Sequence, residues 1–238
     1  MAQRPVFVIN EKAPFFCEKM VEFEFNTGFA VSQKQKTIEN MHDAIRKGCG
    51  ERNILEVSRY SKEKIGRELS AFNLRFMYKG INVTVETAFQ SSKVFEEGGP
   101  YVDLLYGTSI DAKKDVRLSN SGNLIEFNLL GEKFPIEPKT LFYDWIYLNA
   151  LSQKPNLLEI LTEYNSFTDI AFNPKKSINC QARSVAIAVS LYKKDIFYDA
   201  LSDRELFKNT IYQVENKIEY GEQKTPTIYV KMPIIDDL

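Results

Sequence analysis

Three polar side chains between Thr84 and Phe95 have the types and spacing that chemistry on a sugar requires. Glu86, Gln90 and Lys93 supply a carboxylate, an amide and an amine at positions i, i+4 and i+7, which share one face of a helix. A carboxylate can take a proton or stabilise positive charge, and an amine that has lost its proton can act as a nucleophile. The spacing predicts a helix with a reactive face, directed either into a cleft or into solvent.

The flanking segments favour the cleft. SAFNLRF, residues 70–76, comes just before the helix and contributes the amide of Asn73, which could read a hydroxyl or a base edge or else cap local backbone. GGPYVD, residues 98–103, follows it, and its glycines would let backbone amides approach a ligand, although the same residues also make an ordinary turn. A helix between two such segments is expected to form one wall of a pocket.

Two further features could contact a nucleotide. NPKKSINCQAR, residues 173–183, combines Lys175, Lys176 and Arg183 with a helix entrance, which suits a pyrophosphate but also describes a solvated basic loop. Trp145 is the only tryptophan; it could stack on a base, although core packing on an amphipathic helix is the commoner role.

Several separated motifs carry a family resemblance. SAFN followed by VETAFQSSKVF resembles the NADAR family, and the match is closer to the branch in which a NADAR protein is the antitoxin partner of a DarT-type toxin that attaches ADP-ribose to guanine in DNA. Metabolic NADAR proteins have a Trp-Gly-Asp-Gly stretch where this chain has FNPKKSINCQAR, which also favours the antitoxin branch. The other segments that resemble this branch are GFAVSQKQK (28–36), GGPY (98–101), AKKDVRL (112–118), EPKTLFYDWIYLNAL (137–151) and FTDIAFNPKKSINCQARS (167–184).

The resemblance implies an α+β, helix-rich single domain of NADAR type that hydrolyses the N-glycosidic bond between ADP-ribose and guanine in DNA, preferably single-stranded, and releases ADP-ribose. No metal or organic cofactor is expected. Glu86, Lys93 and Asp169 are the expected catalytic residues, with Lys93 acting either as a Schiff-base nucleophile or as a charged donor beside a water that Glu86 activates. The expected substrate-binding residues are Lys36, Ser70, Asn73, Phe89, Gln90, Gly99, Tyr101, Trp145, Lys176, Asn179 and Arg183.

Two other functions are compatible with the same motifs. One is an N-glycosidase of small ribosylamino metabolites, which is the chemistry of the metabolic branch. The other is an antitoxin without enzymatic activity that neutralises its toxin by holding it. A general nucleic-acid-binding module is disfavoured, because aromatic residues do not alternate with basic ones.

Composition limits these possibilities. With 238 residues and 44% hydrophobic content, the chain can bury a full core, and we expect one domain over 1–238 with a core at about 4–194 and an extension at about 195–238. A net charge of −1 argues against nucleic-acid binding through bulk electrostatics. Three cysteines without CxxC spacing and a single histidine predict neither disulfides nor a zinc site. No apolar run is long enough to span a membrane, and no signal peptide is evident, so a cytoplasmic protein is expected.

Short strands and several helices must position these residues. Alternation predicts strands in PVFVI (5–9), VEFEF (21–25) and TIYVKM (227–232), and INVTVE (81–86) reads as a strand that leads into the reactive helix. This order places Glu86 near the helix N-terminus, where the dipole favours its charge. The sheet is expected to be small and antiparallel.

The helix boundaries follow from capping signals. Ser32 and Gln35 fit a capping box for a helix that carries an apolar stripe and ends near Gly50, with His42 expected on its surface. Pro138 fits the first turn of a helix to Leu151. Further helices are predicted over 61–69 and 156–164, in a long segment capped by Ser177, and in SDRELFKNTI (202–211).

Overall fold

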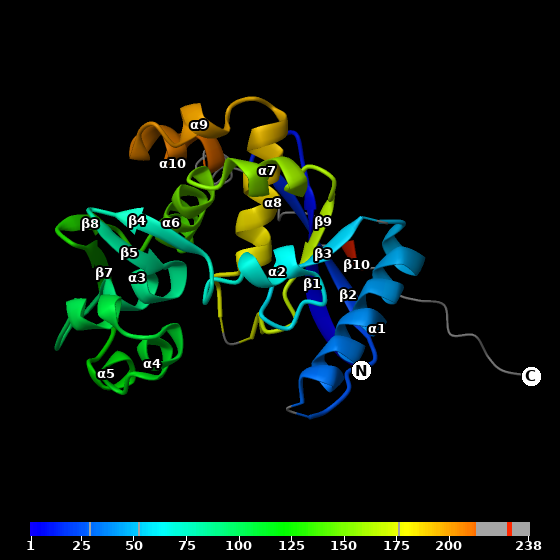
Figure 1. Ribbon diagram of the computed structural model, residues 1–238, viewed down its shortest axis with the longest axis horizontal. Coiled ribbons are helices and arrows are strands. Elements are labelled where there is room, and N and C mark those ends of the chain that lie inside the picture. The colour runs from blue at the N-terminus through cyan, green and yellow to red at the C-terminus, as the bar shows by residue number, and fades with distance from the viewer. Residues whose placement is uncertain (29, 52, 176, 213–227, 230–238) are drawn as a thin grey trace, which may run out of the picture.

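A five-stranded sheet forms one side of the molecule (Figure 1). The computed structural model describes residues 1–28, 30–51, 53–175 and 177–212 and the backbone of 228–229. Strands β1 (Ala2–Ile9) and β2 (Phe16–Phe23) pair antiparallel. Both strands were predicted from alternation, but β1 begins before residue 5, and β2 begins and ends earlier than the predicted 21–25. The strand order is β10-β2-β1-β9-β3, with β3 (Ile54–Glu56), β9 (Ser166–Thr168) and β10 (Ile228–Tyr229). Because β3 pairs parallel with β9 and β10 with β2, this sheet is mixed.

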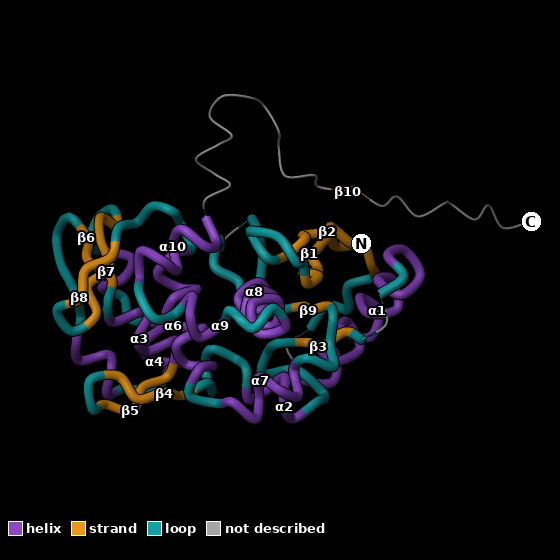
Figure 2. Tube along the Cα trace, turned by 90° about the horizontal axis from the view of Figure 1, so that it is seen from above, coloured by secondary structure: helices purple, strands orange, loops and turns teal. Residues whose placement is uncertain are grey.

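Two smaller sheets lie on the other side, beyond the central helices (Figures 1 and 2). One is the hairpin of β4 (Arg75–Tyr78) and β5 (Ile81–Thr84), which leads directly into helix α3 (Val85–Ser91). The other has the order β6-β7-β8 and consists of β6 (Lys93–Phe95), β7 (Leu124–Leu129) and β8 (Glu132–Phe134). Helices and small sheets together confirm the predicted α+β class.

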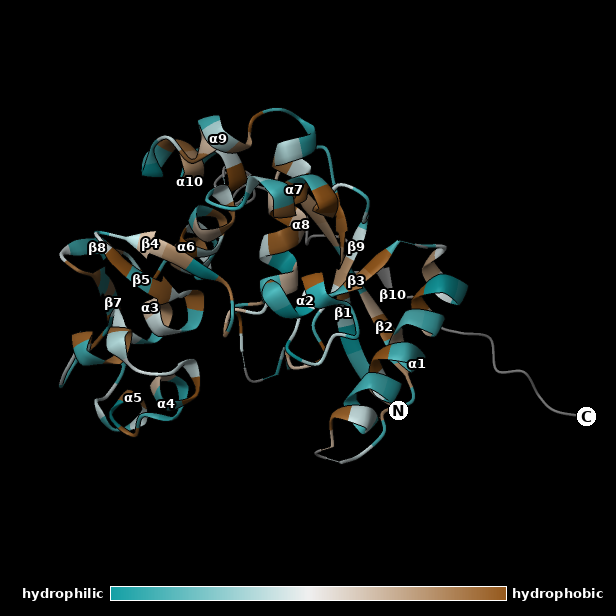
Figure 3. Cartoon of the chain, viewed as in Figure 1, coloured by the Kyte–Doolittle hydropathy of each residue, from teal (hydrophilic) through white to brown (hydrophobic). Residues whose placement is uncertain are grey.

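Two buried helices join the halves. Most residues of α6 (Leu141–Ser152) and α8 (Gln181–Lys193) are buried. Figure 3 shows hydrophobic turns along α8 between the two sides of the molecule. Around them lie α1 (Val31–Cys49), α2 (Lys64–Glu68), η1 (Val102–Tyr106), α4 (Ser109–Lys114), α5 (Arg117–Asn120), α7 (Pro155–Leu161), α9 (Phe197–Ala200) and α10 (Arg204–Tyr212). Of the described helices, none is both long and apolar enough to cross a membrane.

Helix α1 confirms the predicted apolar stripe and corrects two details. Its buried side includes Ile38, Met41 and Ile45. The capping box is wrong, because the N-cap is Ala30, whose methyl group cannot accept a hydrogen bond, and Ser32 already lies inside the helix. The expected surface position of His42 is also wrong, because its ring is buried against Thr168 of β9.

Other boundaries also differ from the predicted ones. Helix α6 begins at Leu141, and Pro138 lies in the preceding turn, where its carbonyl accepts from Leu141 N at 3.0 Å. Ser177 does not cap α8: the N-cap is Cys180, and Ser177 Oγ donates to the carbonyl of Asn179. Helices α2 and α7 are shorter than predicted, and the last two apolar positions of TIYVKM, 230 and 232, lie outside the described residues.

Candidate functional site

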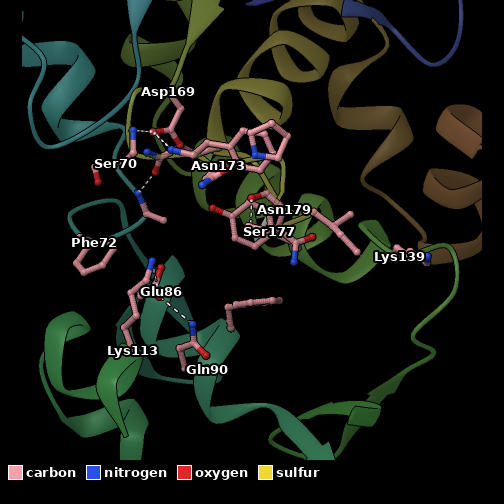
Figure 4. Close-up of a pocket in the computed structure, with 18 of the residues that line it drawn as sticks. Ser70, Phe72, Glu86, Gln90, Lys113, Lys139, Asp169, Asn173, Ser177 and Asn179 are labelled. Atoms are coloured by element: carbon pink, nitrogen blue, oxygen red, sulfur yellow. Dashed lines mark hydrogen bonds and ion pairs between the residues drawn. The ribbon is translucent and has the colours of Figure 1, made fainter. Parts of the chain in front are cut away.

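A pocket of about 990 Å³ lies between α3 and the loop that precedes α8. Figure 4 shows Glu86, Gln90 and Lys113 on one wall, with Asp169 and Asn173 on the opposite wall. These walls come from segments about eighty residues apart in the chain. The pocket is therefore a product of the tertiary fold, and the central helices hold its two sides in place.

The reactive segment begins as predicted and ends earlier. Thr84 caps α3 through a reciprocal pair of hydrogen bonds with Thr87, which places Glu86 in the first turn with 5% of its surface exposed. The predicted helix through Phe95 is wrong, because α3 ends at Ser91. The next residues turn into β6, where Lys93 pairs with a residue of β7.

Serine side chains at the end of α3 help to end it. Ser91 Oγ donates to the carbonyl of Ala88 at 3.2 Å, and Ser92 Oγ donates to the carbonyl of Phe89 at 2.9 Å. These bonds satisfy carbonyls that the next helical turn would otherwise bind. Lys93 thus leaves the helix but still lines the same pocket as Glu86 and Gln90.

Glu86 and Gln90 are linked within the pocket wall. Gln90 Nε2 donates to Glu86 Oε1 at 2.9 Å, and Lys113 Nζ lies 3.7 Å from the same oxygen. The other amide atom, Gln90 Oε1, is buried and finds no hydrogen-bond partner within the described part of the chain. Because an unsatisfied buried acceptor is costly, this oxygen is suited to accept a hydrogen bond from a ligand.

Lys93 has the environment of an amine that gives up its proton readily. The side chain is partly buried, and its Nζ lies 4.7 Å from the centre of the Phe89 ring. The pKa of Lys93 is lowered to about 8, chiefly by burial; the charge of Glu86 opposes this shift, and the charge of Lys113 adds to it. At pH 7.5, roughly a quarter of this amine is therefore neutral and able to act as a nucleophile.

Asp169 faces the pocket from the end of β9. One carboxyl oxygen, Oδ1, accepts from the backbone N–H of Ala171 at 2.9 Å and of Phe172 at 3.2 Å. Burial, assisted by the nearby charge of Glu56, raises the pKa of Asp169 to about 8. This carboxyl group is therefore mostly protonated at neutral pH and can donate a proton.

Other predicted binding residues also line the pocket. Ser70 and Phe89 are buried in its wall, and Asn179 lies in the loop before α8. Asn179 Oδ1 is a second buried acceptor that none of the described groups satisfies. Ser70, Phe89, Gln90 and Asn179 therefore remain candidates for ligand contact.

Two residues that were predicted to contact the ligand pack inside the protein instead. Arg183 Nη1 lies 3.0 Å from Asp144 Oδ2, and the guanidinium also covers the ring of Phe16. Trp145 packs edge to face on Phe207, with the ring centres 5.2 Å apart. Neither Arg183 nor Trp145 lines the pocket, because α6 and α8 turn both side chains toward other helices and strands.

The GGPY turn also lies outside the pocket lining. Tyr101 Oη shares a 2.5 Å hydrogen bond with Ser121 Oγ, and the guanidinium of Arg117 covers its ring. Gly99 has a φ of +85°, and a Cβ there would lie 2.3 Å from the carbonyl oxygen of Lys93. This glycine thus allows the backbone to pass close to the start of β6, which is a positioning role.

Two other predicted contacts, Asn73 and Lys36, are not part of the lining. Asn73 Nδ2 donates to the carbonyl of Arg67 at 2.8 Å, which is the local capping alternative. Lys36 is exposed on α1, away from the pocket. Lys176 lies outside the described residues.

The structure adds contacts that the sequence did not single out. Arg59 and Lys113 both approach the ring of Phe72, at 5.7 and 5.0 Å from its centre. Gln181 Oε1 accepts from Ala71 N at 2.8 Å, and its Nε2 donates to the carbonyl of Val57, so it ties two pocket segments together. The basic run around Lys113 was visible in the sequence, whereas the other positions carried no distinguishing local pattern.

The pocket mouth carries several cations, and no metal-type cluster accompanies them. The exposed basic side chains of the lining are Arg59, Lys113, Lys139 and Lys175. Among the residues that the structure describes, no group of three or more His, Cys, Asp or Glu side chains could hold a metal ion. The cations of the lining carry the charge that contacts to an anionic ligand require.

An α+β fold with a pocket of about 990 Å³ lined by ionisable and apolar side chains is typical of a protein that binds or converts a ligand. Comparison with protein-family models gives a match to the DarT1-associated NADAR antitoxins over residues 2–220. The chain belongs to this family, and its functional partner is accordingly a DarT toxin. A comparison with curated proteins gives no match.

Proposed function

We propose that this antitoxin hydrolyses the N-glycosidic bond between ADP-ribose and guanine in DNA and so reverses the modification made by its toxin. The observation that carries the proposal is the convergence of Lys93, Glu86 and Asp169 on one pocket. An amine with a lowered pKa and a carboxyl group with a raised pKa are matched to nucleophilic attack and to proton donation near neutral pH.

The size and charge of the pocket support a nucleotide-like substrate. Its volume of about 990 Å³ lies at the upper end of the range of roughly 300–1,000 Å³ that is typical of small-molecule sites. The cations at its mouth could meet a pyrophosphate, while Gln90 Oε1 and Asn179 Oδ1 could accept hydrogen bonds from hydroxyl or N–H groups.

Lys93 performs the first half of the proposed reaction. Opening of the ribose ring leaves an imine between the anomeric carbon and the guanine nitrogen, and the neutral Lys93 amine adds to that carbon. The carbon–guanine bond then breaks, and the departing nitrogen takes a proton from Asp169. The sugar remains joined to Lys93 as a Schiff base, so one carbon–nitrogen bond replaces another.

Glu86 performs the second half. Its carboxylate removes a proton from the water that attacks the Schiff base and then gives this proton to the Lys93 nitrogen as that nitrogen leaves. The proton released when the sugar carbonyl forms returns to Asp169, so ADP-ribose is released and all three side chains regain their starting states. The other division of roles keeps Lys93 protonated as a hydrogen-bond donor while Glu86 activates water for direct attack. The lowered pKa of Lys93 favours the first of these routes.

A defined substrate tests the proposal. An oligonucleotide carrying ADP-ribosyl-guanine is incubated with the protein, and released ADP-ribose is measured by liquid chromatography and mass spectrometry. Lys93→Ala and Glu86→Ala should each lower the rate at least about tenfold, whereas the exposed control Lys64→Ala should match the wild type. Full activity in both pocket variants would reject the site assignment.

Two experiments distinguish the proposed activity from the alternatives, which are an N-glycosidase of small ribosylamino metabolites and an antitoxin that acts only by binding its toxin. Free ribosylamino metabolites are offered in place of the modified oligonucleotide, and faster turnover of the free compounds would favour the metabolic activity. The toxin is also titrated with Lys93→Ala antitoxin. One-to-one inhibition that survives this substitution would favour neutralisation by binding.

A further inference from the structure

A buried carboxylate lies behind the pocket at the junction of β3 and β9. Glu56 is the last residue of β3, pairs in register with Thr168 and is 2% exposed. Its Oε1 accepts from Ser58 Oγ at 2.6 Å and from Ile170 N at 2.9 Å. Its Oε2 accepts from Thr168 Oγ1 at 2.6 Å. Burial raises the pKa of Glu56, and the three donors around its carboxyl group oppose this shift because they favour the ionised form.

The hydrogen-bonded chain continues away from the pocket to α1. His42 Nε2 lies 2.9 Å from Thr168 Oγ1. Because the single proton of this hydroxyl points to Glu56, the hydroxyl oxygen must accept from His42, which assigns the Nε2–H tautomer. Burial lowers the pKa of His42 to about 4, so the ring is neutral at neutral pH. Every link thus donates toward Glu56.

Asp169 directly follows Thr168 and competes with Glu56 for a proton. Two adjacent buried carboxyl groups cannot both ionise cheaply. Asp169 accepts two backbone N–H groups, both at Oδ1, and the Gln181 side chain also favours its ionised form, whereas Glu56 accepts hydrogen bonds at both of its oxygens, from two hydroxyl groups and one backbone N–H. The charge therefore belongs on Glu56 and the proton on Asp169.

The other ionisable groups around Glu56 and Asp169 do not change which of the two carboxyl groups holds the proton. Burial raises the pKa values of Tyr143, Tyr147 and Cys180 near Asp169, so these groups are neutral. The charge of Arg4 interacts with Asp169 and favours its ionised form, but burial outweighs this effect, since the pKa of Asp169 is raised. The charges that act on His42 come from its own helix, namely Glu39, Asp43 and Arg46.

We propose that Glu56 is a positioning residue that keeps Asp169 protonated, so that Asp169 can give its proton to the departing base. The proposal rests on the proposed function for its catalytic meaning. The protonation of Asp169 is a property of the folded protein and can be measured without substrate. Ser58 connects Glu56 to the pocket, because its hydroxyl group donates to Glu56 and the residue also lines the pocket.

Infrared spectroscopy tests the protonation directly. A protonated carboxyl group has a carbonyl stretching band that is absent from a carboxylate, and the difference between wild type and Asp169→Asn isolates the band of Asp169. The Glu56→Gln substitution should shift the titration of this band to lower pH by about one unit or more. The control Glu51→Gln, which changes a carboxylate paired with Lys19, should leave it unchanged.

A milder variant keeps the test informative where Glu56→Gln does not fold. Ser58→Ala removes one donor from Glu56, which draws the shared proton toward Glu56 and should shift the Asp169 band in the same direction by a smaller amount. An unchanged titration in a folded Glu56→Gln protein, or in folded Ser58→Ala protein where the first variant fails to fold, would overturn the proposal.

Kinetics separate this inference from the proposed function. In Glu56→Gln, the alkaline limb of the kcat profile should move to lower pH together with the infrared titration, while KM stays within about twofold. A wild-type protein without glycohydrolase activity would reject the proposed function, and the infrared result would still decide the role of Glu56. A shifted band with an unshifted kcat limb would overturn the catalytic part of the inference.

Discussion

The buried pair of Asp144 and Arg183 allows a sharp test of the assignment of Arg183 to the core. Asp144 is 1% and Arg183 12% exposed at the side chain, and their closest atoms are 3.0 Å apart. Ser184 Oγ and Tyr212 Oη each donate to Asp144 at 2.6 Å. In Asp144→Asn, the Arg183 charge stays buried without its counter-charge. Such a loss costs about 3–5 kcal/mol, and we expect about 3 because the amide oxygen still accepts one hydrogen bond.

Urea unfolding monitored by circular dichroism measures this loss. Arg183→Met should cost less than Asp144→Asn, because Asp144 keeps its two hydroxyl donors, and the double variant should lie near the Arg183→Met value. Lys208→Ala, in an exposed pair, serves as the control and should change stability by less than about 0.5 kcal/mol. An Asp144→Asn protein as stable as the control, or a stable Arg183→Met protein with a greatly raised KM, would refute the core assignment.

Two buried groups predict opposite pH dependences of stability. The folded-state pKa of His42 is lowered to about 4 from 6.5, so its neutral ring stabilises the fold above pH 6.5, and this contribution is lost as pH falls. His42→Gln should therefore remove about 2 kcal/mol of the destabilisation seen between pH 7 and 4.5 in urea unfolding; an unchanged acid loss would contradict a buried neutral ring. The folded-state pKa of Asp169 is raised from 3.8 to about 8, so its stabilising contribution is present below pH 3.8 and declines up to pH 8. Asp169→Asn should gain stability over the wild type from pH 5 to 8.5, and parallel curves would show that Asp169 ionises normally.

Local patterns predicted the elements better than their ends. The strand that leads into a helix near Glu86 is correct, because alternation along the strand is a local signal. The spacing of Glu86, Gln90 and Lys93 predicted a shared pocket wall, although the helix ends at Ser91. The three residues do line one pocket, but they do not share one helix: Lys93 reaches the pocket from β6.

Long-range contacts explain what the sequence could not predict. Arg183 looked like a phosphate ligand because its partner Asp144 lies 39 positions earlier in the chain. Glu56 gains its role only when β3 pairs with β9, which no local pattern announces. His42 is an intermediate case: Ile38 and Ile45 place it on the apolar stripe of α1, so its burial could have been inferred from spacing.

Chemical trapping of the sugar on Lys93 tests the central claim most directly. The protein is mixed with an oligonucleotide carrying ADP-ribosyl-guanine in the presence of sodium cyanoborohydride, digested, and mapped by mass spectrometry. We expect a reduced ADP-ribose adduct on Lys93, none on the neighbouring Lys113, and loss of turnover in Lys93→Arg, which keeps the charge but not the nucleophile. Rapid turnover without an adduct on Lys93, together with full activity of Lys93→Arg, would contradict it.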